Sequence, residues 1–178
     1  MSPDSKRADA SRNRNRLLAA AREVLAESGN DAALDVIARR AGVGNATLYR
    51  HFPTRADLLA AVYADEVAAL CRRGAGLLTA AEPLDALFTW LDEFVVHVAT
   101  KRALALAATE GARRTSLFGQ WHASITSTAA RLVERAGPAL RDDITVADVL
   151  TRASGAALAT DAAHARRLVA LLRGGIEA

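Results

Sequence analysis

A short run of polar and small residues, 44–51, carries the side chains best suited to recognition chemistry in this sequence. An Asn side chain can pair with adenine through two hydrogen bonds, and a Thr methyl group can contact the methyl group of thymine. Tyr and His can hydrogen-bond to phosphates, which fixes position without reading sequence. The run and an arginine shortly after it therefore predict a DNA-binding surface. Its candidate residues are Gly44, Asn45, Thr47, Tyr49, Arg50, His51 and Arg55.

The residues that must position this run have the pattern of a helix-turn-helix. Ala38 is small enough to let two short helices cross closely, and Gly42 provides a turn with an unhindered backbone. Val43 and Leu48 can anchor the second helix beneath the first. The outer face of the second helix is then free to enter the major groove of DNA.

The stretch IARRAGVGNATLYRHFPTRADLL, residues 37–59, resembles the DNA-binding segment of TetR-type regulators. Its Ile-Ala, Ala-Gly-Val, Leu-Tyr-x-His-Phe and Leu-Leu elements fall at the spacing of that family, and the resemblance extends over about residues 12–70. It implies a homodimer, an effector pocket in a C-terminal body, and release of DNA when the effector binds. By position, it implies DNA contacts at Thr47, Tyr49 and His51, with Arg55 where the family usually has a lysine.

One position departs from the family pattern. Ala33 precedes the first helix of the motif where the family often has a Ser or Thr that caps the helix and also bonds a phosphate. Asp35, in the first turn of that helix, suits the helix dipole but repels DNA.

The spacing of apolar residues predicts an all-α chain of about nine helices, with a three-helix DNA-binding head and a C-terminal helical bundle. Alanine supplies much of the 51% hydrophobic content, and the 4 prolines are few, which favours helix. Capping pairs are predicted at Thr54 with Asp57 and at Thr145 with Asp148, and Asp161 can cap the last helix. The helices are predicted over 12–28, 34–41, 45–52, 54–76, from Pro83, over 103–109, around 118–132, over 145–160 and over 161–174, with a basic loop at 111–116.

Three segments are expected: a disordered polar arm at 1–11, the DNA-binding domain at 12–70, and an effector-binding and dimerisation domain at 71–178. Residues 1–60 contain 10 Lys and Arg against 7 Asp and Glu, whereas the remaining residues contain 13 of each. This distribution favours a polyanionic partner for the first third of the chain. The basic residues near the N-terminus are either a solvated start or an arm that contacts phosphates: Lys6, Arg7, Arg12, Arg14 and Arg16.

The C-terminal domain holds aromatic and imidazole side chains that fit either an ordinary bundle core or a mostly apolar pocket with a few polar anchors. The candidate pocket residues are Trp90, Phe94, His97, Phe118, Trp121 and His122. We expect a small, mostly apolar effector with a polar or acidic group. The last two helices, rich in Ala, Gly and Leu, predict a homodimer surface, although they could instead complete the core of a monomer.

Other classes of function are disfavoured. Motifs of hydrolases, zinc proteases and nucleotide-binding enzymes are missing from the sequence, so no catalytic site and no cofactor are predicted. Glu93 and His97 fall short of a metal-ligand set. A single cysteine, Cys71, and a polar N-terminus without a long apolar run favour a cytoplasmic protein. The expected function is repression of transcription at a palindromic operator. Two alternatives stay open. The protein could activate transcription, or it could bind DNA without an effector, either in an architectural role or under the control of a protein partner.

Overall fold

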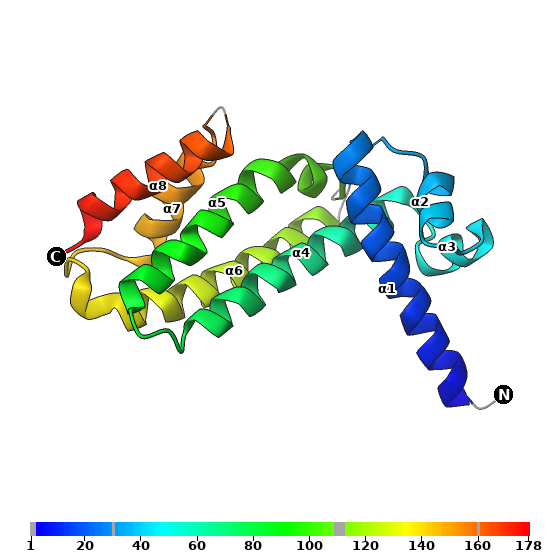
Figure 1. Ribbon diagram of the computed structural model, residues 1–178, viewed down its shortest axis with the longest axis horizontal. Coiled ribbons are helices and arrows are strands. Elements are labelled where there is room, and N and C mark those ends of the chain that lie inside the picture. Colours follow the sequence, from blue (N-terminus) through cyan, green and yellow to red (C-terminus); the bar gives the residue numbers. More distant parts are fainter. Residues whose placement is uncertain (1–2, 30, 109–112, 160) are drawn as a thin grey trace. The chain divides into compact units, whose positions relative to one another are not determined.

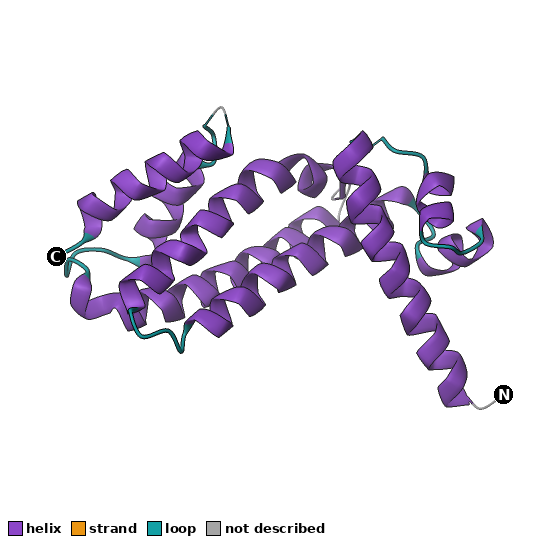
Figure 2. Cartoon of the chain, viewed as in Figure 1, coloured by secondary structure: helices purple, strands orange, loops and turns teal. Residues whose placement is uncertain are grey.

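The computed structural model describes residues 3–29, 31–108, 113–159 and 161–178 (Figure 1). Within these ranges the chain is built of helices joined by loops (Figure 2), and the single β-type bridge pairs Leu140 with Glu177. The predicted all-α class is therefore confirmed. The elements are α1 (Pro3–Ser28), α2 (Leu34–Arg40), α3 (Asn45–His51), α4 (Arg55–Leu77), α5 (Pro83–Ala108), α6 (Arg113–Ala136), the short 3-10 helix η1 (Gly137–Ala139), α7 (Val146–Ala156) and α8 (Ala162–Ile176).

The chain divides into two compact units, here called the head and the body. The head comprises Met1–Ala64 with Ala103–Gly111, and the body comprises Asp65–Arg102 with Ala112–Ala178. Both α4 and α5 continue from one unit into the other, so each of these helices is a covalent link between them.

The predicted helix starts are confirmed by their capping contacts. Thr54 and Asp57 exchange hydrogen bonds at the start of α4, from each backbone N–H to the side chain of the other, both at 3.1 Å. Thr145 and Asp148 form the same capping box at α7, and the Asp161 carboxylate accepts from the backbone N–H of His164 at 2.7 Å. These contacts satisfy backbone donors that the first turn of a helix leaves without partners.

The start of the first helix differs from the sequence prediction. The first helix begins at Pro3, so residues 3–11, expected as a disordered arm, are helical. A proline suits the first turn of a helix because its missing N–H has no partner there anyway. The segment that follows contains good helix formers, and Asp9 and Arg12 form an ion pair one turn apart.

The separate helix expected at 103–109 is part of α5, which runs unbroken from Pro83 to Ala108. No glycine or proline lies between Pro83 and Ala108, so neither helix breaker ends the helix earlier. The described ranges therefore contain eight α-helices instead of about nine. The expected basic loop at 111–116 is also corrected in part: α6 begins at Arg113, while 111 and 112 lie outside the described residues.

Each unit has its own apolar core. In the head, α1 contributes the buried residues Leu17 and Val24, while α2, α3 and the start of α4 contribute the fully buried residues Ile37, Leu48 and Leu58. In the body, the largest fully buried side chain is Trp90 of α5. None of the described helices combines the length and apolarity that crossing a bilayer requires.

Candidate nucleic-acid interface

The turn between α2 and α3 has the geometry that the helix-turn-helix pattern predicts. Gly42 has a φ of +64°, a left-handed conformation that L side chains adopt at a cost. Its carbonyl accepts a hydrogen bond from Arg16 of α1 at 3.3 Å, and the N–H of Val43 donates to Ala38 at 3.0 Å. Ala38 is itself buried, as the close crossing of the two helices requires.

The short helix α3 is anchored on one side and exposed on the other. Leu48 is fully buried, and Phe52, directly after the helix, is almost so. Tyr49 is 51% exposed although it is a large aromatic residue. The other predicted contact residues of the run are also accessible: Gly44, Asn45 and Arg50 are exposed, and Thr47 and His51 are half-buried. The structure therefore places five of the candidates that precede Arg55 on one helix and the sixth, Gly44, at its N-cap.

Arg55 has a contact that the sequence did not predict. Its guanidinium donates from Nη2 to the carbonyl of Ala32 at 2.8 Å, and the side chain is half-buried. Arg55 thus ties the start of α4 to the loop before α2. A bond to a main-chain carbonyl 23 residues away leaves no signal in the sequence, because any residue type could supply that acceptor.

The departure at the start of α2 is present in the structure. Ala33 occupies the N-cap position without a side-chain hydrogen bond. Asp35 in the first turn pairs with Arg39 at 3.1 Å on the exposed surface. The negative charge of Asp35 is therefore partly compensated within α2 itself.

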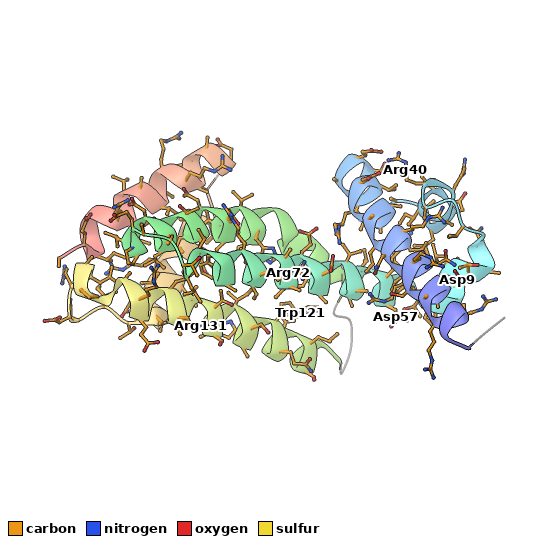
Figure 3. All side chains as sticks on the ribbon, turned by 60° about the horizontal axis from the view of Figure 1, so that its bottom comes forward. Asp9, Arg40, Asp57, Arg72, Trp121 and Arg131 are labelled. Carbon is orange, nitrogen blue, oxygen red and sulfur yellow. The ribbon has the colours of Figure 1, made fainter. Side chains whose placement is uncertain are left out.

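Arg40 of α2 is held within the protein by the acidic residues of α1 (Figure 3). Its guanidinium lies 3.0 Å from the carboxylate of Glu27 and 3.3 Å from that of Glu23. The hydrogen bond and the positive charge of Arg40 lower the pKa of Glu27 below its ordinary value, and the same contacts raise the pKa of Arg40. Arg40 therefore belongs to the packing of α2 against α1, and its charge is already compensated.

The body contains a groove of about 300 Å³ between α4 and α5. Across it, Arg73 of α4 donates to Glu93 of α5 at 2.8 Å. Of the six predicted pocket residues only His97 lines the groove, whose lining consists of Glu66, Ala69, Leu70, Arg73, Glu93, Val96 and His97.

The other predicted pocket residues lie elsewhere in the body. Trp90 and Phe94 are buried and stacked, with ring centroids 5.6 Å apart. Trp90 also donates from Nε1 to the carbonyl of Leu70 at 3.1 Å, so it is a packing residue between α4 and α5. Phe118 contacts Trp121 edge to face, at 5.8 Å between centroids, and His122 is exposed.

Comparison with known proteins shows two family matches in consecutive parts of the chain. Residues 17–62 match the model of bacterial regulatory proteins of the tetR family. Residues 82–178, more than half of the chain, match the model of the SbtR-like C-terminal domain of transcriptional regulators. A comparison with curated proteins returned no similar sequence.

Solved structures agree over almost the whole chain. A TetR transcriptional regulator from Streptomyces coelicolor is 37% identical, with 92% of this chain and 98% of that one covered and a TM-score of 0.76. A TetR regulatory protein from Mycobacterium vanbaalenii is 32% identical, with 97% and 99% covered and a TM-score of 0.77. A regulator from Agrobacterium tumefaciens, 19% identical with 95% and 100% covered and a TM-score of 0.70, shares the fold. The chain therefore belongs to the TetR family of DNA-binding transcriptional regulators, a family without enzymatic activity.

Proposed function

We propose that this protein represses transcription by binding, as a homodimer, to a palindromic operator, and that an effector bound in the body releases it. The observation that carries the DNA-binding part is the exposed face of α3. Tyr49 is 51% exposed and so does not serve the core, for which the helix already has Leu48 as its buried anchor. Placed in a major groove, this face would present hydrogen-bonding side chains to bases and phosphates.

Replacing Tyr49 by alanine is expected to weaken operator binding by about 10- to 150-fold, because a hydrogen bond to a charged group contributes roughly 1.5–3 kcal/mol. The duplex for this measurement is one enriched from a random library by the wild-type protein. Tyr49→Phe, which removes only the hydroxyl, should show most of this loss, because both variants remove the same hydrogen bond. Undiminished affinity of Tyr49→Ala, with the helix content unchanged, would contradict the assignment.

The dimer part of the proposal rests on the last two helices. Leu158, two residues after α7, and Leu171 of α8 are 69% and 73% exposed, so two large apolar side chains remain accessible in this part of the protomer. On α8, exposed residues recur at helical spacing along one stripe, at Ala163, Arg167, Ala170, Leu171 and Gly174. Three of these five residues are alanine or glycine, and their small side chains allow a second copy of the helix to approach closely. Val169 and Leu172, by contrast, are buried within the protomer and complete its own core.

The effector part of the proposal rests on the groove between α4 and α5. Apolar atoms of Ala69, Leu70 and Val96 can contact the apolar part of a ligand, while Arg73 and His97 offer polar anchors. Because α4 continues from the body into the head and carries Arg55 at its first residue, a ligand that displaces α4 also acts on the head. Such a ligand shifts DNA binding only by its preference for the form that does not bind DNA.

Two measurements test the effector part: where a stabilising compound binds, and whether the compound and the operator weaken each other's binding equally. A compound that raises the melting temperature of the wild type should lose this effect in Ala69→Trp, which fills the groove. It should keep the effect in Ala75→Trp, an exposed α4 position outside the groove. It should weaken operator binding, and the operator should weaken its binding by the same factor, about 5- to 150-fold. A groove-filling compound that leaves operator affinity unchanged would favour control by a protein partner instead.

A further inference from the structure

The first turns of α1 form an exposed arm. None of the side chains of residues 7–16 is buried, and Leu17, which follows them, is fully buried. In Figure 1 these turns extend past α2 and α3, which belong to the same unit. The segment contains four arginines and one acidic residue, Asp9. Its position is therefore not explained by burial of apolar surface, and its charge is strongly positive.

Three of the four arginines have partners within the head. Arg16 donates to the carbonyl of Gly42, and Arg14 lies over the ring of Phe52, 5.8 Å from its centroid. Arg12 forms an ion pair with Asp9, so the single acidic group of the segment is compensated. Arg7 is exposed and takes part in none of these contacts.

Helix geometry places Arg7 relative to α3. Arg7 and Arg14 are seven residues apart, about two turns, so they lie on the same side of α1 with about 10 Å between them along its axis. Phe52, which Arg14 contacts, is the residue directly after α3. Arg14 therefore lies at the end of the proposed recognition helix, and Arg7 lies about two turns of α1 farther towards the N-terminus on the same side. Arg12 lies about 140° around the helix from Arg7, on another face.

We propose that this arm is a second DNA contact, in which Arg7 bonds a backbone phosphate beyond the base pairs that α3 faces. The inference rests on the proposed operator binding and extends it. A duplex carries a negative charge about every 1.7 Å along its axis, so an exposed guanidinium held beside it meets a phosphate at almost any register. Arginine also matches phosphate geometry through two parallel N–H donors. The contact would strengthen binding without reading sequence.

Arg7→Ala and Arg12→Ala form a matched pair, because each removes one positive charge from the same exposed segment. Affinity is measured against salt concentration for two duplexes, one enriched by the wild type and one of unrelated sequence. Arg7→Ala is expected to reduce the slope of log K against log salt by about 0.9 per protomer, which is roughly an eightfold loss of affinity at 0.1 M salt. The loss should be equal on both duplexes, and Arg7→Lys should retain the slope. Arg12→Ala should change the slope much less.

Each contrary outcome has a distinct meaning. An unchanged slope for Arg7→Ala, while the wild type still enriches a duplex and Tyr49→Ala weakens it, would overturn the arm contact alone. Equal losses for Arg7→Ala and Arg12→Ala would overturn it too, because they would reflect net charge and not the face of the helix. Failure of the wild type to enrich any duplex would overturn both the arm contact and the operator binding on which it rests. Circular dichroism of each variant verifies that the helix content is unchanged.

Discussion

Gly74→Ala is expected to lower the free energy of unfolding by about 2 kcal/mol. A Cβ atom at this position of α4 would overlap Cγ2 of Thr128 in α6 and lie 2.9 Å from Nε1 of Trp90 in α5. Trp90 cannot move aside freely, because it is fully buried and its indole N–H bonds the carbonyl of Leu70. Overpacking of this kind costs about 1–3 kcal/mol, and the lost hydrogen bond adds about 1 kcal/mol. The better helix propensity of alanine offsets less than about 1 kcal/mol of this.

Gly76→Ala is the matched control, in the same helix and only two residues away. A Cβ atom there meets nothing within 4 Å, so the substitution should stabilise the protein by about 0.5–1 kcal/mol through helix propensity alone. The two variants should therefore change stability in opposite directions. Urea denaturation at a fixed protein concentration measures both, since the stability of a dimer depends on concentration. Equal effects of the two variants would show that α4 does not approach α5 and α6 as closely as the structure indicates.

Leu48→Ala is expected to destabilise the head by about 2–5 kcal/mol and to abolish operator binding. Leu48 is fully buried and is the apolar anchor of α3. A helix of seven residues does not persist in water on its own, so α3 depends on this anchor for its structure. DNA binding should therefore fail although Leu48 itself contacts no base.

Hydrogen exchange locates the effect of Leu48→Ala. Amide protection in α3, such as that of the Leu48 N–H bonded to Gly44, should be lost, while protection in the body stays. Val36→Ala, at a position of α2 that is 38% exposed, is the control and should change stability by less than about 0.5 kcal/mol. Retained operator affinity in Leu48→Ala would mean that α3 is not the element that binds DNA.

Local sequence rules predicted the parts of this structure that depend on near neighbours. The pairs Thr54–Asp57 and Thr145–Asp148 are capping boxes because their spacing of three residues brings side chain and backbone together in any helix start. Gly42 marked the turn because few other residues adopt its backbone conformation without strain. The outward face of α3 followed from these, because Leu48 could serve only as its anchor.

Contacts between distant residues could not be predicted in the same way. The first helical turns of the chain have no apolar periodicity in their sequence, and none of residues 7–16 is buried in the structure. The sequence therefore predicted a polar arm there and not a helix. In the body, Trp90 and Phe94 have the composition of either a core or a pocket, and only packing distinguishes the two. The groove is bounded instead by a pair such as Arg73 and Glu93, 20 residues apart on different helices, which no local pattern connects.

The most direct test of the proposed dimeric operator binding is selection of duplexes from a random library by the full chain, with the number of bound copies determined on the enriched duplex. The expected product is an inverted repeat bound by two copies of the chain, with half-site centres about 10 base pairs apart or a multiple of that helical turn. Tyr49→Ala, carried through the same selection, should enrich it poorly or not at all. Enrichment of no sequence by the wild type, or of a single half-site bound by one copy, would contradict the account.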